Sequence, residues 1–105
     1  MNRKLIIVED APFCSILVKK MVMGQPFDIK TVDHVDKITD IGDLNSEDIV
    51  LLDLIGTGSE KITLSQDVRI ISMSSNPDLN PELIKPFNQE SLFKVLFPEN
   101  EGKVA

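Results

Sequence analysis

Residues 5–10 read LIIVED, four apolar residues followed directly by two carboxylates. Because this run does not alternate with polar residues, it predicts a strand that is buried on both faces. Similar runs occupy residues 49–54 (IVLLDL) and 68–73 (VRIISM), and two shorter strands are expected at residues 27–32 and 83–84. Apolar strands that are separated by helical segments predict an α/β domain with a doubly wound, five-stranded parallel sheet.

A helix is expected directly after the first strand. Pro12 suits a first helical turn, Asp10 is placed to cap it, and Gly24 is expected to end it. The apolar stripe of this helix has side chains at intervals of four residues, Phe13, Leu17 and Met21, with Cys14 and Val18 beside them.

The connection between the fourth and fifth strands is too short for a packed helix. It has seven residues, 75–81, and two of them are prolines. A parallel crossover that contains a helix needs roughly a dozen residues or more. We therefore expect this helix to be missing or one turn long. Further helices are expected at residues 36–44, 60–66 and 89–97.

The composition describes one small acidic domain. The chain has 105 residues, 42% of them hydrophobic, which is enough for a single core. Its net charge of −6 predicts no direct binding to nucleic acid or to anionic lipid. The single cysteine, Cys14, excludes an internal disulfide, and the apolar runs are too short for a membrane span or a signal peptide. These features predict a cytoplasmic domain at residues 1–97 and a polar tail at 98–105.

Polar side chains follow the apolar strands. They are Glu9 and Asp10 after the first strand, Asp53 at the third, Ser74 after the fourth and Lys85 after the fifth. The carboxyl ends of parallel strands share one rim of the sheet, so we expect these groups to converge. Carboxylates this close favour a hard divalent cation, Mg²⁺ or Mn²⁺. A nearby ammonium and hydroxyl fit transfer of a phosphoryl group onto a carboxylate.

The order of four motifs, LIIVED, VLLDL, IISMSS and IKPF, resembles the receiver domain of two-component response regulators. The resemblance covers nearly the whole chain and implies a flavodoxin-like or CheY-like fold. It implies that Asp53 accepts the phosphoryl group and that Ser74 and Lys85 bind it. It also implies a metal site formed by four groups: Glu9, Asp10, Asp53 and the backbone carbonyl of Ile55.

The same resemblance implies partners. A histidine kinase or a phosphotransfer protein would supply the phosphoryl group, and a downstream protein would receive the signal. The chain would be a phosphoacceptor rather than an enzyme, with self-catalysed phosphotransfer and autodephosphorylation.

The sequence departs from the receiver pattern at two places besides the short fourth crossover. Glu82 stands where receivers usually have an aromatic switch residue, and residues 55–58 (IGTG), expected to form a flexible turn, replace a Met-Pro turn. The loss of the aromatic residue at Glu82 and the short fourth crossover favour an alternative function, a receiver-like interaction or scaffold module whose output does not require phosphorylation.

The short crossover also predicts an interaction surface. Without a helix there, one face of the fourth and fifth strands, with some of Ile70, Met73 and Leu83, would be poorly covered. Exposed apolar patches of this kind usually contact a partner, so we expect a homodimer or another protein on this face. Alternatively, Phe87 and Phe93 fold over the gap.

Overall fold

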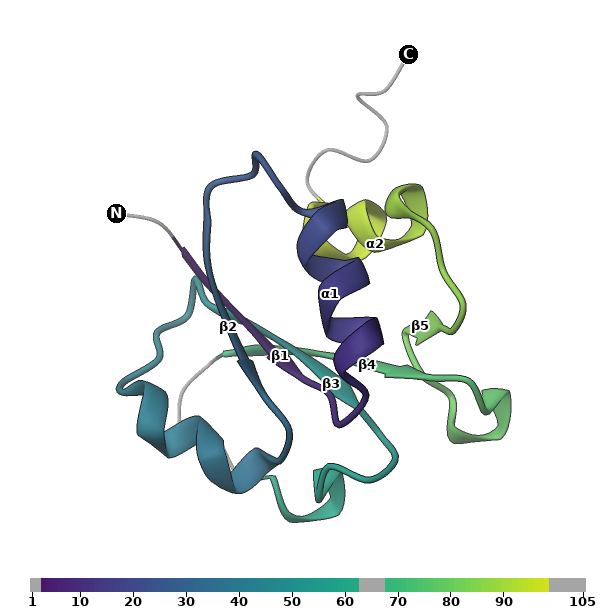
Figure 1. Cartoon of the computed structure of the whole chain (residues 1–105), viewed down its shortest axis with the longest axis horizontal. Helices are drawn as coiled ribbons and strands as arrows, with labels where there is room; N and C mark the ends of the chain where they lie inside the picture. The colour runs from purple at the N-terminus through teal and green to yellow at the C-terminus, as the bar shows by residue number, and fades with distance from the viewer. Residues whose placement is uncertain (1–2, 63–67, 99–105) are drawn as a thin grey trace.

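The computed structural model describes residues 3–62 and 68–98, which form a five-stranded parallel sheet with the order β2-β1-β3-β4-β5 (Figure 1). This order, with helices between the strands, is that of the flavodoxin-like doubly wound fold, and it confirms the predicted fold class. Residues 99–105 of the predicted tail lie outside the described residues. The strands are β1 (Arg3–Val8), β2 (Phe27–Val32), β3 (Ile49–Asp53), β4 (Arg69–Ser74) and β5 (Leu83–Ile84).

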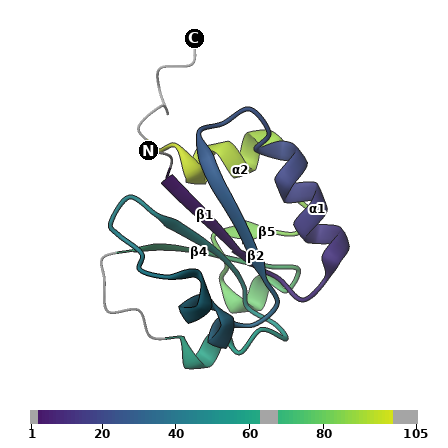
Figure 2. The same ribbon diagram turned by 60° about the vertical axis from the view of Figure 1, so that its left-hand side comes forward.

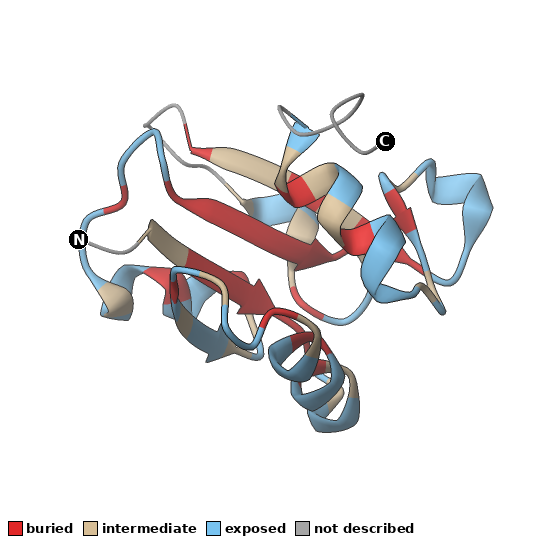
Figure 3. Cartoon of the chain, turned by 90° about the horizontal axis from the view of Figure 1, so that it is seen from above, coloured by how far each residue is buried: buried red, intermediate tan, exposed pale blue. Residues whose placement is uncertain are grey.

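The central strand β3 is buried along its whole length, as Figure 3 shows. Successive side chains of a strand point to opposite faces, so the sheet has two apolar layers. Helices α1 (Pro12–Met21) and α2 (Gln89–Leu96) cover one face, and the 3₁₀ helix η1 (Val35–Ile41) packs against the other (Figure 2). No helix in the described ranges combines the length and apolar character needed to span a bilayer.

The predicted helix at residues 36–44 is a 3₁₀ helix. It spans Val35–Ile41 and ends before Leu44, and its apolar residues Val35, Ile38 and Ile41 are three apart, which matches three residues per turn better than 3.6. Another 3₁₀ helix, η2 (Ser59–Lys61), begins the segment where a helix was expected at residues 60–66. The rest of that expected helix, from residue 63, lies outside the described residues.

The predicted core stripe of α1 is confirmed at Val18 and wrong at Phe13 and Leu17. Phe13 is 70% exposed and Leu17 is 40% exposed. Ser15 and Val18 are buried, as is Val22, which follows the helix, and Met21 is half-buried and packs against the same core. Apolar residues lie on two sides of this helix, and the smaller side chains form the contact that brings it close to the strands. The larger ones are left on an open surface.

The short crossover between β4 and β5 is confirmed. It contains a single 3₁₀ turn, η3 (Pro77–Leu79), whose first residue is preceded by the capping residue Asn76. The Asn76 side-chain oxygen accepts a hydrogen bond from the Asp78 N–H at 3.0 Å. No longer helix is present between residues 75 and 82.

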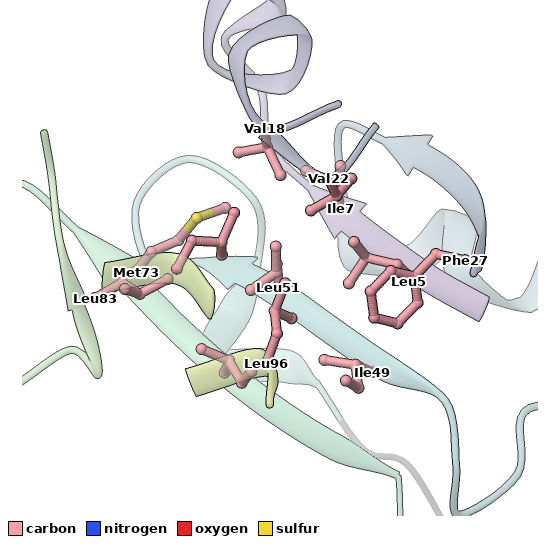
Figure 4. Packing of buried hydrophobic residues seen from close by; sticks show 12 residues of the cluster. Leu5, Ile7, Val18, Val22, Phe27, Ile49, Leu51, Met73, Leu83 and Leu96 are labelled. Carbon is pink, nitrogen blue, oxygen red and sulfur yellow. The ribbon is translucent and has the colours of Figure 1, made fainter. Parts of the chain in front are cut away.

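The prediction that Met73 and Leu83 are poorly covered is wrong. Their exposed fractions are 0% and 3%, because strand alternation directs them to the face that α1 and α2 cover (Figure 4). The opposite face, toward the missing helix, has Ile70, which is half-buried, and Ile84, which is 53% exposed. Phe87 and Phe93 do not fold over this gap, since both pack against the layer below α1 and α2.

Candidate functional site

The carboxyl ends of β1, β3 and β5 bring three charged side chains together. Lys85 Nζ lies 2.7 Å from Glu9 Oε2 and 2.7 Å from Asp53 Oδ2. The exposed fractions of the Glu9, Asp53 and Lys85 side chains are 1%, 9% and 17%. One ammonium therefore bridges two carboxylates in a nearly water-free position, although the three residues are far apart in the sequence.

Backbone geometry fixes the two ends of this bridge. Asp53 is the last residue of β3, and its Oδ1 accepts a hydrogen bond from the Ile55 N–H at 3.0 Å. The Thr57 hydroxyl donates to the Asp53 backbone carbonyl, which holds the loop against the strand end. Lys85 directly follows β5, and its N–H donates to the Ser74 carbonyl at 2.9 Å.

Asp10 completes an acidic cluster instead of capping α1. The helix begins after Ala11 and has no side-chain cap, so the predicted capping role of Asp10 is wrong. One carboxylate oxygen from each of Glu9, Asp10 and Asp53 lies within 4.8 Å of the others. Asp10 is exposed and its carboxylate lies against Gly56, in the loop that follows β3.

Ser74 and Ile55 lie beside the cluster without joining the Lys85 network. Ser74 is 1% exposed, and its Oγ accepts a hydrogen bond from the Asn76 N–H at 3.0 Å. In residues 3–62 and 68–98, no hydrogen bond joins the Ser74 hydroxyl to the carboxylates. Because Ser74 Oγ is an acceptor in its present bond, its own O–H can still donate to a further group. Ile55 contributes its N–H to Asp53 and exposes its side chain.

Burial and mutual contact give the two bridged carboxylates different pKa values. Burial, reinforced by a hydrogen bond with Asp53, raises the pKa of Glu9 to about 7. Burial opposes ionisation of Asp53 as well, but hydrogen bonds with Glu9 and Lys85 hold the pKa of Asp53 below its ordinary value. The pKa of Lys85 is raised by the same two carboxylates, against the effect of burial. At neutral pH Asp53 is therefore an anion, Lys85 is a cation, and Glu9 is close to its midpoint.

The cluster fits a small divalent cation. Three carboxylates and one ammonium carry two excess negative charges when Glu9 is ionised, and all the donor atoms are oxygens, which Mg²⁺ and Mn²⁺ prefer. Glu9 and Asp53 are buried whereas Asp10 is exposed, so the cluster is open to solvent on one side. Mg²⁺ usually keeps several of its water ligands, and an open side leaves room for them.

The loop at residues 55–58 is tightly packed, in contrast to the flexible turn that the sequence predicts. Gly56 and Gly58 have φ values of +80° and +75°, which other residues rarely adopt. A Cβ atom at Gly56 would meet Asp10, and one at Gly58 would meet His34. The Val35 N–H also binds the Thr57 carbonyl at 2.9 Å. Sequence reasoning assigned these glycines only to a flexible turn, although their position three and five residues after Asp53 was a visible signal.

Comparisons with solved structures identify the fold. The chain is similar to the signal receiver domain of a protein named as a Luxo repressor from Vibrio parahaemolyticus, with a TM-score of 0.68 and 22% identity over 91% of this chain and 88% of that one. It is also similar to the receiver domain of sensor histidine kinase PA1611 from Pseudomonas aeruginosa PAO1. That match has a TM-score of 0.68 and 17% identity over 93% of this chain and 97% of that one. The second structure has a magnesium ion coordinated in its active site cleft.

A third similar structure is the RcsB response regulator of Salmonella typhimurium, with a TM-score of 0.67 and 17% identity. The match covers 97% of this chain but 63% of that one, so the chain spans less than two thirds of RcsB. No protein-family model matches the sequence, and neither does any curated protein. These three structures are receiver or response-regulator proteins, and the chain has the receiver-domain, CheY-like fold.

Proposed function

We propose that this chain is the phosphoacceptor receiver of a two-component phosphorelay, with Asp53 as the acceptor. The observation that carries this proposal is the buried bridge in which Lys85 contacts Glu9 and Asp53, next to Asp10. A bridge of this kind places an ionised carboxylate, a fixed positive charge and a set of oxygen donors at one strand end. The receiver fold supports the same function.

The chemistry requires little of the protein beyond positioning and charge neutralisation. An oxygen of the ionised Asp53 carboxylate attacks the phosphorus atom of a phosphohistidine on the partner. The new O–P bond forms as the P–N bond breaks, and the electron pair of the P–N bond stays on the imidazole nitrogen. Lys85 neutralises charge on the transferred group, and Ser74 donates its hydroxyl hydrogen to a phosphoryl oxygen.

Four groups would hold the metal: the carboxylates of Glu9, Asp10 and Asp53 and the backbone carbonyl of Ile55. When bound, Mg²⁺ or Mn²⁺ supplies charge neutralisation for the phosphoryl oxygens. The magnesium ion in the PA1611 receiver domain supports a cation of this kind for the present cluster.

The affinity for Mg²⁺ should rise with pH because Glu9 must lose its proton to bind a cation. With a pKa of about 7, Glu9 is mostly protonated at pH 6 and mostly ionised at pH 8. The dissociation constant measured by calorimetry should therefore fall about tenfold between these pH values. The Glu9→Gln variant has no such proton, so its weaker affinity should be nearly constant over the range. A wild-type affinity that is also constant would contradict the role of Glu9.

We propose that the partner protein presents its phosphohistidine on a helix and that this helix docks in an apolar groove beside the site. The groove has a volume of about 300 Å³ and lies between α1 and the segment that follows β5. Lys85 lines the groove and also contacts Asp53, so the groove is continuous with the acceptor. An amphipathic helix fits an apolar groove, and a helix that carries phosphohistidine would bring its phosphoryl group to this rim. The α1 residues that line the groove are Phe13, Cys14, Leu17, Val18 and Met21.

The Phe13→Asp variant should lose phosphotransfer from a phosphohistidine protein and keep phosphorylation by a small donor. Phe13 is 70% exposed and lines the groove, so a charge there disturbs docking without disturbing the core. We expect the rate of transfer from the protein donor to fall at least about tenfold. Ile84→Asp is the matched control, because Ile84 is 53% exposed and does not line this groove. Equal losses in the two variants would argue against docking at α1.

A second candidate function is a receiver-like interaction module that does not need phosphorylation. The single turn η3 in place of a helix favours it. So does Glu82, which pairs with Arg69 at 3.7 Å and is joined through its N–H to Ser72 Oγ at 3.0 Å. Neither of these two contacts of Glu82 involves a residue of the acidic cluster. A homodimer on this side stays a prediction, and it now depends on Ile70 and Ile84 alone.

A further inference from the structure

The loop after β3 places a glycine in direct contact with a predicted metal ligand. An ideal Cβ built on Gly56 would lie 2.4 Å from Asp10 Oδ2 and 3.2 Å from Asp10 Cγ. Cβ atoms essentially never approach another heavy atom closer than 3.0 Å, so any side chain here would displace the carboxylate by more than half an ångström. The Asp10 carboxylate thus occupies the space that a side chain at Gly56 would fill.

The position of the Asp10 carboxylate is less restrained by other contacts than those of the other two carboxylates. Glu9 and Asp53 are buried and held by Lys85, whereas Asp10 is exposed. Within the described parts of the chain, no hydrogen bond or ion pair holds the Asp10 carboxylate. The missing side chain at Gly56 therefore leaves free the space in which the Asp10 carboxylate lies near Glu9 and Asp53.

We infer that Gly56 is a positioning residue, whose missing side chain lets the Asp10 carboxylate reach the divalent cation. This inference rests on the proposed metal site, because it concerns the affinity of that site for Mg²⁺. Asp10 Oδ2 is the far end of a side chain, so a methyl group at Gly56 moves the ligand and leaves the sheet intact. Displacing or misorienting a metal ligand typically costs tenfold or more in affinity.

Gly58 offers a matched control two residues away. Its φ of +75° is close to the +80° of Gly56, so alanine meets the same backbone strain at both positions. A Cβ at Gly58 would also lie 2.4 Å from a side chain, but that side chain is His34, which is outside the acidic cluster. The two alanine variants therefore differ chiefly in whether the displaced group is a metal ligand.

The test is calorimetric titration of Mg²⁺ into the full chain at pH 8, with thermal melting in EDTA as a measure of the metal-free fold. We expect Gly56→Ala to weaken Mg²⁺ binding at least about tenfold and Gly58→Ala to change it less than about twofold. Both variants should melt at similarly lowered temperatures in EDTA. In an Asp10→Ala background, Gly56→Ala should cause no further loss of affinity, because the ligand it displaces is already gone.

Wild-type affinity in Gly56→Ala would overturn the inference, as would an equal loss in Gly58→Ala or a loss that persists in the Asp10→Ala background. If Gly56→Ala does not fold, Gly56→Asn and Gly58→Asn replace the alanine pair, since asparagine tolerates a positive φ and still carries a Cβ. Absence of Mg²⁺ binding by the wild-type chain would overturn the metal site itself. Wild-type binding with no selective effect at Gly56 would overturn the positioning role alone.

Discussion

The Asp53→Asn variant should gain no phosphoryl group from a small phosphodonor and Mg²⁺, whereas the wild-type chain should gain one. Asparagine keeps the shape of the side chain and can still accept the Ile55 N–H. It removes the negative charge and with it the nucleophile, so the covalent step should be lost entirely and not merely slowed. Intact mass measured after incubation with acetyl phosphate gives the result directly.

The control for this experiment is Asp28→Asn, which changes a half-exposed aspartate of β2 that pairs with Lys30 at 3.7 Å. This variant should gain the phosphoryl mass as the wild-type chain does. A gain in Asp53→Asn equal to that of the wild-type chain would mean that another residue is the acceptor. If the wild-type chain gains no mass at any donor concentration, the receiver function is wrong and the phosphorylation-independent module is favoured.

The strands and their ends could be predicted from local sequence because their signals are local. A continuous apolar run such as residues 49–52 requires burial on both faces, and only a parallel sheet covered by helices provides that. Once the strands are parallel, their carboxyl ends lie at one rim. The proximity of Glu9, Asp53 and Lys85 then follows from topology, without any knowledge of side-chain geometry.

The orientation of α1 could not be predicted because its sequence is apolar on two sides. Phe13 and Leu17 form one acceptable core stripe and Val18 and Val22 form another, and the choice depends on how the helix leaves β1. Sequence periodicity measures how apolar a stripe is and does not show which stripe meets the sheet. The groove on α1 is the direct consequence of this choice.

The packing of the loop after Asp53 was unpredictable for a different reason. Gly56 and Gly58 are near Asp53 in sequence, but they contact Asp10 and His34 from two other strand ends. Local reasoning detects a glycine and infers freedom of the backbone. Only the tertiary structure shows that the absence of a side chain at each glycine makes room for the close approach of another side chain.

The second large effect should come from Lys85→Met, which leaves two buried carboxylates without their cation. Glu9 and Asp53 both lie 2.7 Å from the Lys85 ammonium, and all three side chains are less than one fifth exposed. Removing one partner of a buried ionic group typically costs about 3 kcal/mol, because the remaining charges stay desolvated. We expect a loss of about that size in the free energy of unfolding at pH 8, measured by denaturant unfolding.

The pH dependence of this loss distinguishes charge from packing. Without Lys85, the pKa of Glu9 rises further above its value in the unfolded chain, and the pKa of Asp53, which burial raises, is no longer held below its ordinary value by Lys85. A carboxyl group with a raised folded-state pKa destabilises the fold increasingly as pH rises through the interval between the two values. The loss in Lys85→Met should therefore be smaller near pH 4.5, where Glu9 is protonated, than at pH 8, and Mg²⁺ should restore part of it at pH 8. Lys94→Met, which removes an exposed lysine paired with Glu90 at 3.8 Å, should show neither effect. A loss in Lys85→Met that is equal at both pH values would instead mean that the side chain stabilises the fold by packing and not by its charge.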